Sequence, residues 1–396
     1  MTSSAPVQQA TSSPSAFDYL DLKAQFATIQ DEIMEAIARV MRSQHFILGP
    51  EVSAFEEEIA RLLEVPHAVA CASGSDALVL ALMALGIGSG DEVITSPFTF
   101  VATAGSIVRV GARPVFVDMD SSTFNMDPNN IDAAVTPRTK AIIPVHLFGL
   151  PAEMDSILEI ARSRGLAVIE DAAQAIGASY KGRPVGNLGD LGCFSFFPSK
   201  NLGGAGDGGL VATGNDELAK KMRMLRVHGS RKKYHHELLG INSRLDALQA
   251  AILRVKLKRL PEWTLGRQAR AERYRALFGQ SGLGKQVRVP ETPSEEYVHV
   301  YNQFTIRCAW RDELRTFLAA RGIPSEIYYP LCLHMQPAFS YLGYTAGQFG
   351  VAERASREVL SLPVYPELRD SQQQAVVNAI AAFYDLQLLY SGAQSA

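Results

Sequence analysis

One lysine stands between an apolar, aromatic run and a cluster of glycines. The run covers residues 193–198, Lys200 follows Pro198 by two positions, and residues 203–209 contain five glycines. A lysine that leaves a buried strand for such a turn is desolvated, and desolvation disfavours its ammonium form. A free amine at neutral pH is what a Schiff-base lysine needs. The stretch alone equally allows a surface lysine at a strand end, so the rest of the chain must decide.

A second candidate is the turn at residues 73–76, Ser-Gly-Ser-Asp, between a short apolar strand and an apolar helix that runs to Leu85. Backbone N–H groups and hydroxyls at the positive end of a buried helix suit a phosphate, which makes Gly74 and Ser75 candidate ligands. Taken alone, an ordinary serine N-cap is the more frequent explanation of this pattern.

Strands and helices alternate from residue 92 to residue 171, which predicts a parallel sheet with ligands at the carboxyl ends of its strands. Asp171 and Gln174 follow the strand predicted over residues 166–169. A buried carboxylate there needs a cationic or hydrogen-bonding partner, such as a protonated pyridine nitrogen, although a helix N-cap is an alternative. Phe100, after the strand predicted over residues 92–95, suits stacking on a flat ring or plain core packing.

Composition narrows the function classes. The chain has 396 residues, which is long enough for two domains, and is 47% hydrophobic and 20% charged. Its net charge of -3 gives no general attraction to nucleic acid or anionic membranes. The four cysteines form no CxxC pair and fit a reducing cytoplasm. No apolar run approaches a membrane span. Residues 1–16 lack a basic start and an apolar core, so we expect a disordered tail and no signal peptide.

Two further patterns carry less weight. Residues 204–209 match G-x-G-x-x-G, but an apolar strand follows them, whereas a dinucleotide fingerprint must open a helix. The basic loop at residues 228–236 contains three histidines without metal-ligand spacing, so a solvated loop or an anion-binding loop is favoured. Elsewhere we predict a helix opened by Asp127 and Pro128, a helix from residue 242 to about 260 that Pro261 breaks, and a strand over residues 298–307.

From about residue 17 to residue 389 the chain resembles the DegT/DnrJ/EryC1/StrS family of pyridoxal-phosphate (PLP) sugar aminotransferases. Matching motifs occur in the right order at residues 46–50, 73–78, 168–174, 194–202, 206–209, 242–246 and 361–363. The resemblance implies the fold-type I aminotransferase architecture, α/β with a mostly parallel seven-stranded sheet in a large domain (17–261) and a smaller C-terminal α/β domain (262–396). It also implies a homodimer with both active sites at the interface.

By resemblance, Lys200 forms the Schiff base with PLP and then moves the proton, and Asp171 pairs with the pyridine nitrogen. Gln174 is implied near the phenolic oxygen and Phe100 on the ring face. The implied phosphate ligands are Gly74, Ser75 and Ser195, with Asn242 from the other subunit. For substrate we expect contacts from Arg244, Tyr329 and His334. Tyr328 stands where the family usually has histidine, which leaves the substrate subgroup open.

The resemblance implies a ping-pong reaction in which L-glutamate leaves its amino group on the cofactor as pyridoxamine phosphate (PMP). A nucleotide-linked keto-sugar, UDP- or dTDP-linked and favoured as a 3-keto sugar by residues 228–236, then receives it to become an amino sugar for polysaccharide or glycoconjugate biosynthesis. The alternatives are a PMP-dependent sugar dehydratase, a non-catalytic regulatory protein of the same fold and a nicotinamide oxidoreductase. Lys200 disfavours the first, because dehydratases of the family have histidine there.

Overall fold

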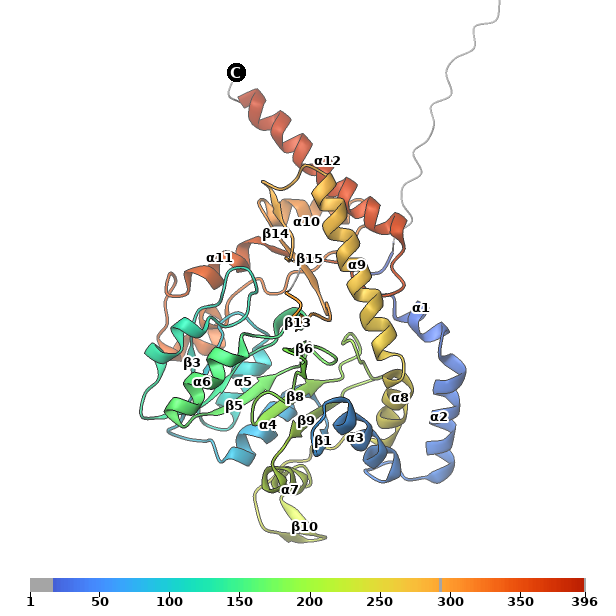
Figure 1. Cartoon of the computed structure of the whole chain (residues 1–396), viewed down its shortest axis with the longest axis vertical. Coiled ribbons are helices and arrows are strands. Elements are labelled where there is room, and N and C mark those ends of the chain that lie inside the picture. Colours follow the sequence, from blue (N-terminus) through green and yellow to red (C-terminus); the bar gives the residue numbers. More distant parts are fainter. Residues whose placement is uncertain (1–16, 292–293, 395–396) are drawn as a thin grey trace, which may run out of the picture.

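A central sheet of seven strands organises the first two thirds of the chain (Figure 1). In spatial order the strands are β1 (His67–Cys71), β9 (Gly209–Thr213), β8 (Leu191–Ser195), β5 (Ala167–Asp171), β4 (Thr139–Ile143), β2 (Glu92–Thr95) and β3 (Arg113–Phe116). All neighbouring pairs are parallel except those of β9, which runs antiparallel to both β1 and β8. The mostly parallel seven-stranded sheet expected from the sequence is therefore confirmed. The computed structural model describes residues 17–291 and 294–394, so the predicted tail over residues 1–16 lies outside it.

Helices cover both faces of this sheet because successive strand residues point to opposite sides. In β1, Ala68 and Ala70 join one buried apolar cluster, and Val69 and Cys71 join another. The helices of this part are α1 (Leu22–Ala27), α2 (Gln30–Ser43), α3 (Pro50–Leu62), α4 (Gly74–Leu85), α5 (Val101–Arg109), α6 (Met154–Arg164), α7 (Asp216–Leu225) and α8 (Ala247–Leu257). Helix α4 is apolar on nearly every side and packs on β8 and β9.

The C-terminal third builds a second core around a small antiparallel sheet. Its strands are β12 (Val287–Arg288), β14 (Phe304–Cys308) and β15 (Val359–Leu362), and its helices are α9 (Leu260–Gln280), α10 (Arg311–Ala319), α11 (Gly350–Glu358) and α12 (Asp370–Gln394). Figure 1 shows α9 running from α8 up to this smaller part. The predicted division at residues 261–262 falls inside α9, and Phe17 and Leu20 pack against the second core.

The remaining strands are short and lie outside the central sheet. Strands β6 (Ser179–Tyr180), β7 (Arg183–Pro184) and β13 (Tyr297–Val298) form one small sheet, and β10 (Ser230–Lys232) and β11 (His235–His236) form a hairpin in the basic loop. Among the described residues, no helix is long and apolar enough to cross a membrane.

Three element predictions were wrong. Asp127 and Pro128 open only two 3₁₀ turns, at Pro128–Asn130 and Asp132–Ala134. Pro261 ends no helix but stands in the first turn of α9, where its missing N–H has no intrahelical partner to lose. The strand predicted over residues 298–307 is split into β13 and β14, because residues 299–303 leave the sheet to bond with the loop after β4.

Candidate active site

A cavity of about 630 Å³ opens at the carboxyl ends of the parallel strands. Lys200 lines it together with most of the residues predicted for the site. These are Gly74, Ser75, Phe100, Asp171, Gln174, Ser195 and Tyr329. Side chains from β5, the segment after β8 and the first turns of α4 and α5 thus meet although they lie far apart in the sequence.

Lys200 lies in a tight turn after β8. Its N–H donates to the carbonyl of Phe197 at 2.8 Å, and a Cβ on Gly203 would lie 2.2 Å from the carbonyl oxygen of Pro198. Only glycine therefore fits at residue 203, and the turn holds the lysine over the cavity. Burial lowers the pKa of the Lys200 ammonium from 10.5 to about 8, and the Asp171 carboxylate opposes this effect. The lysine is thus a candidate nucleophile and base near neutral pH.

Asp171 ends β5 and is 5% exposed. The Thr103 hydroxyl donates to its Oδ2 at 2.7 Å, and the Ala173 N–H donates to its Oδ1 at 3.2 Å. Burial raises the pKa of this carboxyl, whereas the Thr103 and Ala173 hydrogen bonds lower it, as does the charge of Lys200. A buried carboxylate with two hydrogen bonds and no ion pair among the described residues is suited to pair with a positively charged ring nitrogen.

Glu170, the residue before Asp171, fixes this end of the strand. Glu170 is fully buried, and its carboxylate accepts hydrogen bonds from the N–H groups of Gly186, Leu188 and Gly189 at 2.7–2.8 Å. Its Oε2 also lies 3.0 Å from Nε2 of His146. Because every one of these donors comes from another segment, the strand end that carries Asp171 has little freedom to move.

The turn before α4 forms a cradle for an anion. Ser73 caps the helix by accepting the N–H of Asp76 at 3.1 Å, which leaves Gly74 and Ser75 at the positive end of α4. A Cβ on Gly74 would lie 2.6 Å from Cβ of Ser195 and 3.1 Å from its Oγ. The close approach brings the Ser195 hydroxyl to the helix N-terminus, and together they suit a phosphate group.

Gln174 and two aromatic rings define the rest of the cavity wall. Oε1 of Gln174 accepts the Phe148 N–H at 2.7 Å, and its Nε2 donates to the Tyr329 hydroxyl at 3.3 Å. Nε2 has a second N–H that can donate towards the cavity. Phe100 is 56% exposed although it is a large apolar side chain, so one face of its ring is free to stack on a planar ligand. Burial raises the pKa of the Tyr329 hydroxyl, which stays protonated.

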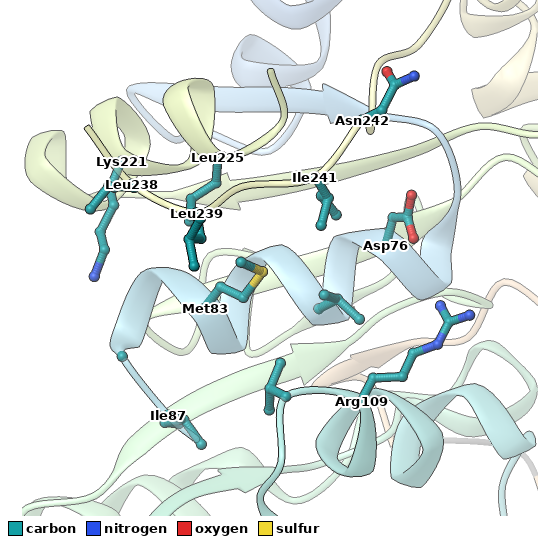
Figure 2. Close-up of a pocket in the computed structure, with 13 residues that line it drawn as sticks. Asp76, Met83, Ile87, Arg109, Lys221, Leu225, Leu238, Leu239, Ile241 and Asn242 are labelled. Carbon is teal, nitrogen blue, oxygen red and sulfur yellow. The ribbon is translucent and has the colours of Figure 1, made fainter. Parts of the chain in front are cut away.

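Three predicted site residues do not line this cavity. Asn242 is exposed and borders a second hollow of about 750 Å³ on the outer side of α4. Figure 2 shows Asn242 beside Asp76 at the start of that helix, with apolar side chains of Leu238, Leu239 and Ile241 along it. Arg244 is half-buried and has no ion-pair partner within residues 17–291 and 294–394.

His334 is the third of these residues. It is 2% exposed, its Nε2 lies 3.1 Å from Oε1 of Glu353, and its ring packs against Phe349. Its partners are thus structural groups of the C-terminal third, and this geometry gives no support to a contact between His334 and substrate.

Sequence reasoning missed several residues that line the cavity. Thr103 holds Asp171, and Gln303 and Ile327 form part of the wall contributed by the C-terminal third, beside Tyr328, which the sequence had already indicated. For Thr103 a signal was present, because Thr99 and Thr103 are one helical turn apart just after a strand end, and their hydroxyls lie 3.2 Å apart. The position of Gln303 had no such signal, since it depends on the unexpected break between β13 and β14.

The chain as a whole is similar to several known proteins. Residues 27–381 match the DegT/DnrJ/EryC1/StrS aminotransferase family. A "pleiotropic regulatory protein" of Geobacillus stearothermophilus is 54% identical over 92% of this chain and 98% of its own. A UDP-N-acetyl-3-dehydro-alpha-D-glucosamine 3-aminotransferase of Acidithiobacillus ferrooxidans is 50% identical over 92% and 97%. The crystal structure of Streptomyces venezuelae DesV with a ketimine intermediate is 45% identical, covers 93% and 98%, and superposes with a TM-score of 0.90.

Proposed function

This chain belongs to the DegT/DnrJ/EryC1/StrS aminotransferase family, and we propose that it transfers the amino group of L-glutamate to a nucleotide-linked 3-keto sugar with PLP as cofactor. The observation that carries the proposal is the meeting of Lys200, Asp171 and the Gly74–Ser195 cradle in one cavity. PLP has an aldehyde, a basic ring nitrogen and a phosphate, and each of these three groups of residues suits one of them.

The chain's own residues supply binding, orientation and proton transfer. Gly74, Ser75 and Ser195 would hold the cofactor phosphate, Phe100 would stack on the ring, and Gln174 would donate to the phenolic oxygen. Asp171 would keep the ring nitrogen protonated. When bound, PLP stabilises the negative charge that forms as the amino donor loses its α-proton. Lys200 Nζ would take that proton from the α-carbon of the donor and, as a general acid, donate it to the former aldehyde carbon of the cofactor.

One observation favours an acceptor sugar whose keto group is at carbon 3. Another favours a catalytic role over a purely regulatory one. The aminotransferase from A. ferrooxidans is named for a 3-dehydro UDP-sugar and shares half of its residues with this chain. The G. stearothermophilus relative is named for a regulatory role. This chain nevertheless has Lys200, Asp171 and the phosphate cradle together in one cavity. A lysine that faces the cavity and whose pKa burial lowers to about 8 suits a protein that carries out turnover.

We further propose a homodimer in which each subunit completes the other's site. Asn242 lies close to the start of α4 and faces the outer hollow (Figure 2). The phosphate cradle lies at the same end of the helix but opens into the main cavity. Leu239, which lines the same hollow, is 94% exposed. Such exposure is unusual for a leucine and indicates that another protein surface covers it. A second copy seated here would bring its Asn242 and the unpaired Arg244 towards the neighbouring cavity, where Arg244 would bind a substrate carboxylate.

Mixed dimers test the shared site. A Lys200→Ala subunit combined with an Asn242→Ala subunit should regain part of the activity, because one of the two sites in the heterodimer is then intact. No recovery in mixed dimers, or a monomer by light scattering, would count against the shared site.

The free, buried cysteines 71, 193, 308 and 332 agree with a reaction in the reducing cytoplasm.

The reaction is tested with purified protein, PLP and L-glutamate against UDP- and dTDP-linked keto-sugars. We expect stoichiometric 2-oxoglutarate and amino sugar with a 3-keto sugar and none with Lys200→Ala protein. Release of 2-oxoglutarate with 4-keto sugars alone would overturn the assignment of the keto carbon. Failure of every keto-sugar, with glutamate still converted once per site, would overturn the acceptor class.

A further inference from the structure

The segment of residues 299–303 crosses from the second core to the cavity and is held on both sides. The N–H of Val300 donates to the carbonyl of Gly149 at 3.1 Å, and that of Asn302 donates to the carbonyl of Phe148 at 2.9 Å. On the other side, Nδ2 of Asn201, the residue after Lys200, donates to the carbonyl of Val300 at 2.9 Å. Phe148 also donates its own N–H to Oε1 of Gln174, so this segment is tied to both edges of the cofactor site.

Gln303 ends this segment with a side-chain amide that has no hydrogen bond in the described structure. The residue is 8% exposed, and its Oε1 is buried without a partner. A buried acceptor that is left unpaired destabilises the folded chain, because its hydrogen bond to water is lost and not replaced. Gln303 lines the main cavity and, with Leu147, a smaller adjoining space of about 240 Å³. An unpaired acceptor on a well-held segment at the junction of two cavities is suited to a ligand.

The chemistry of the groups that enter the cavity indicates which ligand this is. The ring and phosphate contacts come from the central sheet and its helices, whereas Gln303, Ile327 and Tyr328 line the cavity from the C-terminal third. The carboxylates of an amino donor only accept hydrogen bonds, and its amino group is the group that reacts, so the donor offers no other N–H or O–H group to Oε1. A sugar ring has hydroxyl groups, and in some sugars an acylamino N–H, that donate to such an oxygen.

We infer that the Gln303 amide is a specificity-determining contact for the acceptor, whose hydroxyl or acylamino N–H donates to its Oε1. The inference rests on the proposed transfer to a keto-sugar and adds a group that reads the sugar itself. Gln174 is less suited to this role, because its Oε1 already accepts the Phe148 N–H and its Nε2 already donates to Tyr329, whereas Oε1 of Gln303 has no partner. The sugar is thus recognised by a residue of the C-terminal third while the cofactor is held by the sheet.

The test separates the two half-reactions of the holoenzyme. Gln303→Leu keeps the size of the side chain but removes both polar atoms, and Gln303→Glu keeps an acceptor oxygen. We expect Gln303→Leu to lower kcat/KM for the keto-sugar about tenfold or more while the glutamate half-reaction, followed by absorbance, stays within twofold of wild type. Gln303→Glu should recover a substantial part of the loss. An unchanged glutamate half-reaction also shows that the variant is folded and loaded.

A matched control and two acceptors sharpen the result. Gln286 also has a buried Oε1 without a partner but lines neither cavity, so Gln286→Leu should leave both half-reactions unchanged. Comparing a 2-acetamido with a 2-hydroxy keto-sugar identifies the donor, because the acceptor whose kcat/KM falls more in Gln303→Leu supplies the bond. An unchanged kcat/KM for every acceptor, or an equal loss in the glutamate half-reaction, would overturn the inference. If wild-type protein aminates no keto-sugar, the proposed function itself has failed.

Discussion

The reactivity of Lys200 in protein freed of cofactor should follow a pKa of about 8, well below the 10.5 of an ordinary lysine. A lowering of this size corresponds to about 3 kcal/mol of unfavourable desolvation of the ammonium form. At pH 7.5 about a quarter of the Lys200 amines would then be unprotonated, against about one in a thousand for a lysine in water. The chain therefore makes its nucleophile available more than about a hundredfold more often than an exposed lysine would.

Competitive labelling measures this directly. The cofactor-free protein is exposed to a trace of dinitrofluorobenzene between pH 6 and pH 10, with N-acetyl-lysine as internal standard, and the peptide with Lys200 is quantified by mass spectrometry. Asp171→Asn is the informative perturbation. Since the Asp171 carboxylate raises the pKa of Lys200, its removal should move the labelling midpoint to lower pH than in wild type. A wild-type midpoint near 10.5, or a midpoint that rises in Asp171→Asn, would refute the reasoning.

Three further variants test the groups around that lysine. Thr103→Val removes the hydroxyl that donates to Asp171 and should lower kcat for the glutamate half-reaction about tenfold or more, with Thr103→Ser close to wild type; equal defects in both would contradict the hydrogen-bond role. Gly74→Ala forces a Cβ against Ser195 and should weaken PLP binding about fivefold or more in a fluorescence titration, from about 1–3 kcal/mol of overpacking; unchanged affinity would argue against the cradle. Glu170→Ala leaves three buried N–H groups unpaired and should lower the free energy of unfolding by about 3 kcal/mol or more in urea, and a loss below about 1 kcal/mol would argue against its anchoring role.

The predictable part of this molecule is the part that strand order dictates. Lys200, Asp171 and the turn at Gly74 follow strands of a parallel sheet, and the carboxyl ends of such strands meet at one edge. The seven-stranded sheet and the family resemblance are confirmed for the same reason, since both depend on local motifs in a fixed order. The resemblance assigned Asn242 to the site of the other subunit, and the residue lies outside its own cavity, while that assignment stays a prediction.

The less predictable part depends on contacts between distant segments. Residues 298–307 have the composition of one strand, yet Val300 and Asn302 bond to the carbonyls of Gly149 and Phe148 and interrupt it. That interruption is what places Gln303 in the cavity wall. Local propensity cannot foresee it, because the competing partners lie about 150 residues away in the sequence.

Borohydride reduction of the PLP-loaded protein tests the central claim most directly, because it fixes the cofactor to the amine that holds it. Peptide mass spectrometry should find the phosphopyridoxyl group on Lys200 alone, and prior addition of L-glutamate should remove most of it. Lys200→Ala protein treated in the same way should carry no such group. A reduced adduct on another lysine, or one that persists in Lys200→Ala, would contradict the account of this cavity as an aminotransferase site built around Lys200.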